Sequence, residues 1–82
     1  MSYFVYLLEC KDHSFYCGYT KDTKRRFEEH NKGIGSKYTK ARRPTTPRYV
    51  EEQPTLSAAL KREHAIKKFS RKQKEELILS KN

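Results

Sequence analysis

The sequence has 82 residues, of which 19 are Lys or Arg and 10 are Asp or Glu, giving a net charge of +9. A chain of this length holds one small domain, so we expect a single domain over residues 1–82. The excess of positive charge favours a polyanionic partner, most often nucleic acid. The alternative is that this charge only keeps a small protein soluble. The first ten residues lack both the basic region of a signal peptide and the length of a membrane span. We therefore expect a cytoplasmic protein with no membrane contact.

The chain contains two cysteines, Cys10 and Cys17, which form no CxxC pair. A structural zinc site needs a second pair of ligands of this kind, so we do not expect one. Two cysteines in a chain without a leader are typical of reduced cytosolic thiols.

The N-terminal part predicts a β-hairpin. The stretches "YFVYLLEC" (3–10) and "SFYCGYT" (14–20) are rich in aromatic and aliphatic residues and flank the short turn "KDH". A three-residue loop would pair Leu8 with Tyr16 and Tyr6 with Gly18, so that Tyr6 and Tyr16 share one face of the sheet. A shift of one residue in the register would separate the two tyrosines.

A helix is predicted to follow, with Asp22 as its N-cap and Gly33 as its C-cap. Arg26 and His30 are four residues apart and share a face, beside Phe27, which anchors the helix to the sheet. Taken alone, His30 is most simply a cation at the helix C-terminus, where it would suit the helix dipole. Arg26 alone is a solvated helix residue or a phosphate contact.

The remaining chain predicts a basic loop, an edge strand and two helices. Residues 33–47 show no periodicity, 48–53 form a weak third strand, and a helix capped by Thr55 or Ser57 runs to about Phe69. Ser70 and Gln73 make a capping box that starts the last helix, which Leu77 and Ile78 would anchor. The expected fold is α+β, with the order β-β-α-β-α-α: a small three-stranded antiparallel sheet packed with helices.

One residue interrupts the apolar stripe of the helix before Phe69. The stripe consists of Leu56, Ala59, Leu60, Ile66 and Phe69. Glu63 lies on it, three residues after Leu60 and three before Ile66. A carboxylate there must be paired, ligated or placed at the edge of a cleft, because burying it alone is costly. Two readings stay open, an exposed position paired with Lys67 and a functional carboxylate.

Taken together in chain order, these features resemble the GIY-YIG nuclease family, and most closely its small bacterial stand-alone members. The first signature corresponds to "FVY" ending at Tyr6 and the second to "YCG" beginning at Tyr16. The family arginine corresponds to Arg26, and His30 supplies a histidine on the same helix face. The metal-binding glutamate of the family corresponds to Glu63. The loop "GIGSKYT" and the C-terminal "RKQKEEL" are also similar to those members.

The resemblance implies a phosphodiesterase that uses one divalent cation, Mg²⁺ or Mn²⁺, held through Glu63. One of Tyr6 and Tyr16 would accept a proton from the attacking water, and the residues leave open which. A tyrosine with a pKa of ~10 is a poor base, so neighbouring cations must favour its phenolate. Arg26 would stabilise charge on the phosphoryl oxygens, and His30 would orient a tyrosine or relay the proton.

The sequence departs from the family pattern in one serious respect. Many members carry an asparagine beyond the glutamate, and the only one here is Asn82, at the end of the chain. The substitutions at Phe4 and Cys17 within the two signatures fall at strand packing positions. The missing asparagine bears on full activity and not on metal binding, which we expect through Glu63.

The expected nucleic-acid contacts are positively charged or aromatic side chains just before the first helix, on that helix and in the 33–47 loop: Lys21, Lys24, Arg25, Lys37, Tyr38, Lys40, Arg42 and Arg43. Such lysines and arginines hold phosphates without reading bases. Tyr38 would stack on an unpaired base or pack within the loop. The leading hypothesis is a DNA endonuclease, sequence-nonspecific or structure-selective, acting in repair or recombination. Two alternatives are a nucleic-acid-binding module without useful turnover, and an adaptor whose basic face docks an acidic protein partner.

Overall fold

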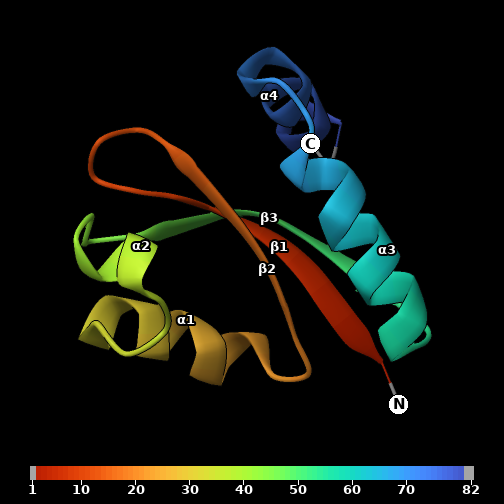
Figure 1. The fold of residues 1–82 in the computed structure, drawn as a ribbon, viewed down its shortest axis with the longest axis horizontal. Helices are drawn as coiled ribbons and strands as arrows, with labels where there is room; N and C mark the ends of the chain where they lie inside the picture. The colour runs from red at the N-terminus through yellow and green to blue at the C-terminus, as the bar shows by residue number, and fades with distance from the viewer. Residues whose placement is uncertain (1, 81–82) are drawn as a thin grey trace.

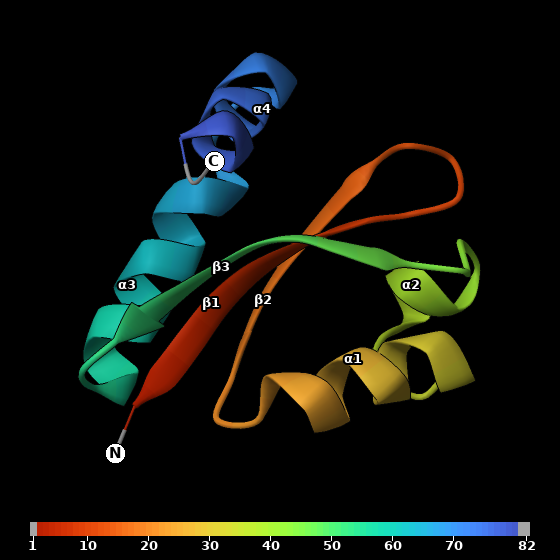
Figure 2. The same ribbon diagram turned by 180° about the vertical axis from the view of Figure 1, so that it is seen from behind.

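The computed structural model describes residues 2–80 as a three-stranded antiparallel sheet with helices on both faces (Figure 1). The strand order is β2-β1-β3, so β1 is central and the other two strands form the edges. Figure 2 shows β3 running beside β1. The elements are β1 (Tyr3–Glu9), β2 (Phe15–Thr20), α1 (Thr23–Lys32), α2 (Lys37–Lys40), β3 (Thr46–Gln53), α3 (Leu56–Lys67) and α4 (Arg71–Leu79).

The β1–β2 hairpin has the predicted register. Leu8 pairs with Tyr16 and Tyr6 pairs with Gly18. The turn is closed by a hydrogen bond of 2.8 Å from the backbone N–H of Cys10 to the carbonyl of Ser14. Tyr6 and Tyr16 therefore lie on the same face, and both would contact a Cβ atom placed on Gly18. The period of two along a strand made this face assignment predictable.

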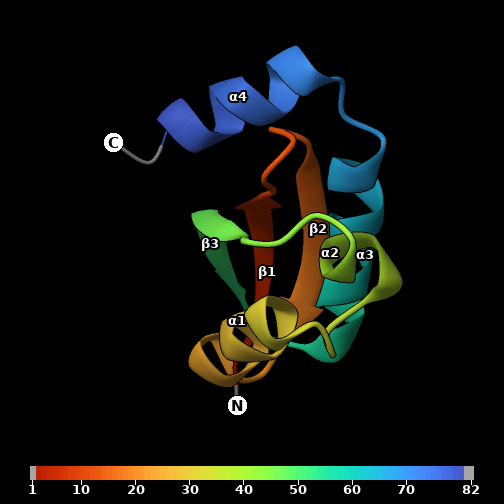
Figure 3. The same ribbon diagram turned by 90° about the vertical axis from the view of Figure 1, so that its left-hand side faces the viewer.

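The two faces of the sheet carry different helices. Val5, Leu7 and Cys17 point to one face and pack in a buried cluster with Ala59 and Ile66 of α3. On the opposite face, the ring of Phe27 in α1 meets the ring of Tyr6, with centroids 5.2 Å apart. Figure 3 shows α1 in front of the sheet and α3 behind it. Any site that combines side chains of α1 and α3 must therefore extend around an edge of the sheet.

The helix termini confirm the predicted caps. The Asp22 side chain accepts a hydrogen bond from the backbone N–H of Arg25, and Gly33 ends α1 in the left-handed conformation at φ 83°. Thr55 caps α3, and Ser70 and Gln73 form the predicted capping box of α4. These caps depend on hydrogen bonds between residues near each other in sequence, so local patterns indicate them well.

Two expectations about the second half of the chain need correction. The 33–47 segment is not only a surface loop, because it contains α2, and Thr39 and Thr45 are buried. Leu56 and Leu60 of the expected apolar stripe are 41% and 42% exposed. Only a narrow face of α3, formed by Ala59 and Ile66, packs against the sheet. Leu77 and Ile78 do pack against this cluster, although they are only partly buried.

Three further features concern the cysteines, membrane-spanning helices and the end of the chain. Cys10 and Cys17 are free, buried thiols. Within the part of the chain that the structure describes, no helix has the length and apolarity needed to cross a membrane. Asn82, which the sequence offers as the only family asparagine, lies outside the described residues.

Candidate active site

The centre of the candidate site is a buried hydrogen bond between the sheet and α1. The hydroxyl oxygen of Tyr6 lies 2.8 Å from Nε2 of His30, and both residues are wholly buried. The ring of Tyr16 packs edge-on against His30, with centroids 5.0 Å apart. The predicted helix spacing and strand register thus bring two tyrosines and a histidine into one cluster.

Arg26 completes this cluster from one turn earlier on α1. Its guanidinium donates to Oε1 of Glu29 at 3.1 Å and to the backbone carbonyl of Gly35 at 3.0 Å. Its side chain is 32% exposed, whereas that of Arg25 is 76% exposed. Arg26 is therefore held in one geometry while still reaching the surface, and its neighbour is largely in solvent.

The electrostatics of the cluster keep both buried groups neutral. Burial raises the pKa of Tyr6 to about 12, although the Arg26 guanidinium beside its hydroxyl lowers it in part. Burial, with a smaller contribution from the Arg26 charge, lowers the pKa of His30 to about 4. His30 is consequently a neutral imidazole at pH 7, and the expectation of a helix C-terminal cation is wrong. Burial lowers the pKa of Arg26, but hydrogen bonds to Tyr6 and Glu29 together shift it upward.

The neutral state of His30 predicts a pH-dependent stability. The pKa is about 4 in the folded protein and 6.5 in the unfolded chain, so unfolding takes up a proton as the pH falls below 6.5. The stabilisation is complete above pH 6.5 and is lost as the pH falls through about 4. Between pH 7 and pH 5 we expect the free energy of unfolding to drop by about 2 kcal/mol.

Urea denaturation at the two pH values tests this expectation. The change between pH 7 and pH 5 should shrink strongly in His30→Gln and persist in His64→Gln, whose histidine is exposed on α3. An unchanged pH dependence in His30→Gln would contradict a neutral buried imidazole.

The α2 segment covers the cluster. Oγ1 of Thr39 lies 2.7 Å from Nδ1 of His30, and Ser36 caps α2 by accepting from the backbone N–H of Thr39. The ring of Tyr38 stacks on Tyr16 with centroids 6.0 Å apart, and the Arg42 guanidinium lies 3.8 Å from the centre of the Tyr38 ring. Tyr38 thus packs against Tyr16 while 36% of the residue stays exposed, and its stacking on an unpaired base remains a prediction.

The sequence offered no functional reading of Thr39, Ser36 or Gly35. A Cβ atom on Gly35 would lie 2.5 Å from Nδ1 of His30, so the loop backbone fits closely against the imidazole. The signal within the sequence was the Ser36 N-cap followed three residues later by Thr39, a pattern that also occurs at ordinary helix starts.

Glu63 is placed differently from the other four candidate catalytic residues. It belongs to α3, and its carboxylate lies 3.6 Å from Nζ of Lys67, with 16% of the side chain exposed. Sγ of Cys17 lies 3.9 Å from the Glu63 backbone carbonyl, and the Glu63 charge adds to the burial that raises the pKa of Cys17 to about 12. Cys17 follows Tyr16 on β2, so Glu63 and Tyr16 lie on opposite sides of the same edge strand.

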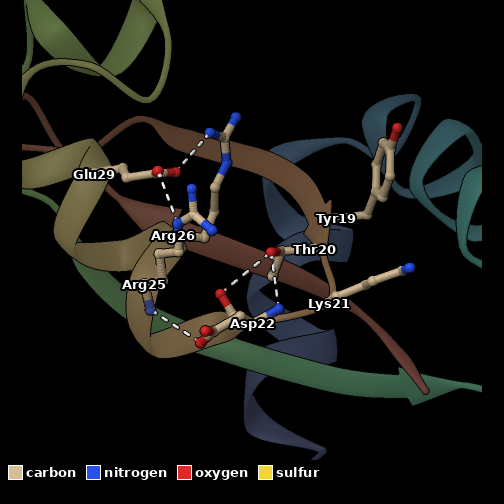
Figure 4. A pocket seen from close by; sticks show the side chains of 7 residues that line it. All are labelled: Tyr19, Thr20, Lys21, Asp22, Arg25, Arg26 and Glu29. Atoms are coloured by element: carbon tan, nitrogen blue, oxygen red, sulfur yellow. Dashed lines mark hydrogen bonds and ion pairs between the residues drawn. The ribbon is translucent and has the colours of Figure 1, made fainter. Parts of the chain in front are cut away.

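A surface cavity of about 490 Å³ opens where β2 runs into α1 (Figure 4). Figure 4 shows Glu29 with ion pairs to both Arg25 and Arg26, in a hollow that Lys21 also lines. The hollow gives an anion access to the Arg26 guanidinium from solvent.

The other predicted phosphate contacts divide into available and engaged side chains. Lys24, Lys37 and Lys40 are exposed. Arg43 is also exposed, and its Nε donates to the Lys40 carbonyl while its guanidinium covers Gly33. Arg42 stacks on Tyr38 and pairs with Asp12 at 3.0 Å, so it is less free to bind phosphate than the sequence indicates.

A metal site made only of protein ligands is not present in the region 2–80. Among these residues, no three His, Cys, Asp or Glu side chains gather closely enough to hold an ion. Glu63 therefore offers a single carboxylate. This fits Mg²⁺, which is usually held by one or two carboxylates together with waters and substrate phosphates.

Comparison with known proteins places the chain in a family. The pattern of the GIY-YIG catalytic domain matches residues 2–76. A UPF0213 protein of Staphylococcus aureus is 52% identical over 77 residues, which cover 94% of each chain. A solution NMR structure of a UPF0213 protein from Bacillus halodurans is 42% identical with a TM-score of 0.64, covering 99% of this chain and 86% of that one.

A second NMR structure, of a protein from E. faecalis, is 44% identical with a TM-score of 0.67 and covers 98% of this chain and 85% of that one. The name UPF0213 assigns no specific activity. The matched domain, the shared fold and the cluster around Tyr6, Tyr16, Arg26 and His30 agree on one assignment. The chain belongs to the GIY-YIG nuclease superfamily.

Proposed function

We propose that this protein is a cytoplasmic endonuclease that hydrolyses DNA phosphodiester bonds with the help of Mg²⁺ or Mn²⁺, and that residues 1–82 act as a single domain. Cleavage is sequence-nonspecific or selective for DNA structure, as repair or recombination requires. The observation that carries the proposal is the cluster of Tyr6, Tyr16, Arg26 and His30 in a chain of the GIY-YIG family.

Arg26 is the group that stabilises the transition state in this proposal. Its guanidinium is oriented by Glu29 and the Gly35 carbonyl, and it reaches the hollow between β2 and α1. A planar guanidinium oriented in advance can donate to two oxygens of a phosphoryl group as negative charge develops there. The guanidinium then needs no reorientation when the charge develops, and a group arranged in advance in this way stabilises the transition state most effectively.

Tyr16 is the tyrosine that we assign as proton acceptor. Tyr6 is wholly buried, and its raised pKa of about 12 keeps its proton in the hydrogen bond with His30. Tyr16 is only half-buried, so solvent reaches its side chain. Tyr6 and His30 then form the support on which the Tyr16 ring packs, and Tyr16 takes the proton of the attacking water.

Glu63 is the residue that would hold the cation. Bound there, a divalent ion supplies Lewis acid chemistry that polarises the phosphate and steadies the leaving 3′ oxygen. Because Glu63 and Tyr16 lie on opposite sides of β2, the substrate phosphate would sit at the edge of this strand. The Glu63 carboxylate also lies 3.6 Å from Nζ of Lys67, an i,i+4 ion pair that helps to orient it.

The substrate is held by a positive surface that does not read bases. Lys24, Lys37 and Lys40 are exposed on α1 and α2, and Lys21 lines the hollow beside Arg26. Ammonium groups of this kind bind phosphates as point charges, so affinity falls steeply as salt rises. Such a surface would bind DNA without sequence preference.

A second candidate function is a nucleic-acid-binding module with little turnover. The observation that favours it is the position of Glu63, which is paired with Lys67 on the face of the sheet opposite Tyr6 and Arg26. Such a module would bind DNA through the same lysines and would not depend on a cation.

The test is cleavage of nicked, branched and single-stranded DNA in Mg²⁺ and in EDTA. We expect the wild type to cleave only with Mg²⁺, and Glu63→Gln to lose at least about a hundredfold in rate. The matched control is Glu76→Gln, an exposed carboxylate on α4, which should keep the full rate. Cleavage that survives Glu63→Gln would refute the assigned metal ligand. Salt-sensitive binding without cleavage by the wild type would establish the module instead.

A further inference from the structure

Thr39 is the wholly buried residue of α2, and its neighbours in sequence point elsewhere. Lys37 and Lys40 are exposed, and Tyr38 stacks on Tyr16. The Thr39 hydroxyl lies 2.7 Å from Nδ1 of His30. A hydroxyl can donate or accept, so the bond that it makes with Nδ1 depends on the state of the other ring nitrogen.

The hydrogen bonds around Tyr6 decide the state of the other ring nitrogen. The Tyr6 hydroxyl keeps its proton at neutral pH, because its pKa is raised to about 12. The neighbouring Arg26 guanidinium is a donor only and cannot accept that proton. His30 Nε2, 2.8 Å from the hydroxyl oxygen, is the acceptor that remains in the pair. His30 therefore uses the lone pair of Nε2, and the single proton of its neutral ring lies on Nδ1.

The surroundings of Thr39 accommodate this arrangement. Its Oγ1 can accept the Nδ1–H proton because its own hydroxyl proton has acceptors in Ser36, with Oγ at 2.9 Å and the carbonyl oxygen at 3.4 Å. Ser36 Oγ in turn accepts from the Thr39 backbone N–H at 3.1 Å. Within residues 2–80, no buried side-chain nitrogen or oxygen lacks a hydrogen-bond partner.

We propose that Thr39 is a positioning residue, which holds His30 in the tautomer protonated on Nδ1 and so leaves Nε2 to accept the Tyr6 hydroxyl. The opposite tautomer would direct an N–H toward the Tyr6 hydroxyl, whose proton would then need another acceptor in a buried place. The ring of Tyr16 packs on the same imidazole. Thr39 thus orders both tyrosines through one histidine.

The effect of Thr39 on cleavage rests on the proposed nuclease function, whereas the tautomer itself does not. Long-range ¹H–¹⁵N correlation spectra of the ¹⁵N-labelled protein identify the protonated ring nitrogen directly. At pH 7 we expect the Nδ1–H pattern for His30 in the wild type and in Thr39→Ser, which retains the hydroxyl. Thr39→Val should shift His30 to the Nε2–H pattern or to a mixture. Thr45→Val is the matched control, because that buried threonine bonds Asn31 rather than His30.

Two results would overturn the proposal: an Nε2–H pattern in the wild type, or an unchanged Nδ1–H pattern in folded Thr39→Val. In the cleavage assay, Thr39→Val should lose roughly tenfold in kcat with KM little changed, and Thr39→Ser should restore most of it. If the wild type does not cleave DNA at all, the proposed function fails while the spectra still decide the tautomer.

Discussion

Replacing Arg26 with alanine is expected to lower kcat for DNA cleavage by about 10²–10³. The physical reason is that Arg26 combines orientation with access, since Glu29 and the Gly35 carbonyl fix its guanidinium beside a cavity open to solvent. The loss should fall on kcat more than on KM, because the strongest interaction is made with charge that develops only in the transition state. Single-turnover cleavage in saturating Mg²⁺ measures this step.

Arg25→Ala is the matched control for this prediction. It removes the same charge one residue away, from a side chain that is 76% exposed and also pairs with Glu29. We expect it to weaken DNA binding slightly, most visibly at low salt, and to leave kcat nearly unchanged. Equal losses in the two variants would show that Arg26 contributes only general positive charge, and its assigned role in the transition state would have to be abandoned.

Replacing Gly35 with alanine is expected to destabilise the protein by about 1–3 kcal/mol or more and to disturb the site. The new Cβ would lie 2.5 Å from Nδ1 and 2.9 Å from Cα of His30. The imidazole is fixed by Tyr6 and Thr39, and Cα belongs to the backbone of α1, so neither can retreat without moving other groups. The Gly35 carbonyl also accepts from Arg26, and its displacement would release the guanidinium.

Urea denaturation at pH 7 measures this loss, and Ile34→Ala provides a control in the same loop. Ile34 is 70% exposed, so its truncation should change the free energy of unfolding by less than about 0.5 kcal/mol. The chemical shifts of His30 should move in Gly35→Ala and stay in place in Ile34→Ala. A stable Gly35→Ala variant with unshifted His30 signals would mean that the loop does not fit against the imidazole as described.

These two predictions share a structural cause, because the segment from Gly35 to Thr39 supports the site from outside the sheet. It contacts Arg26 through a backbone carbonyl and His30 through a hydroxyl. The fold therefore uses α2, its shortest helix among the described residues, to order side chains that α1 and the hairpin contribute to the candidate site. Changes in this segment should affect catalysis although none of its residues is assigned to touch the scissile phosphate.

Local patterns in the sequence predicted much of the fold and part of the site. The register that places Tyr6 and Tyr16 on one face follows from the strand period of two, and the spacing of Arg26 and His30 follows from the helix period. The caps at Asp22, Gly33 and Ser70 depend on hydrogen bonds within a few residues. Each of these features is determined over a short stretch of chain, which is why the sequence by itself indicated them.

Tertiary structure decided what depends on groups that are distant in sequence. The burial that makes His30 neutral comes from its contacts with Tyr6, Tyr16 and Thr39, and it reverses the charge that a helix C-terminus favours. The face of α3 that packs on the sheet is likewise set by tertiary packing, which the spacing of apolar residues alone does not determine. This packing leaves Leu60 exposed. The sequence therefore determined which residues share a local face. Only the folded chain decided that Thr39 joins the cluster and that Glu63 lies across β2 from it, because desolvation and packing depend on every element that surrounds a residue.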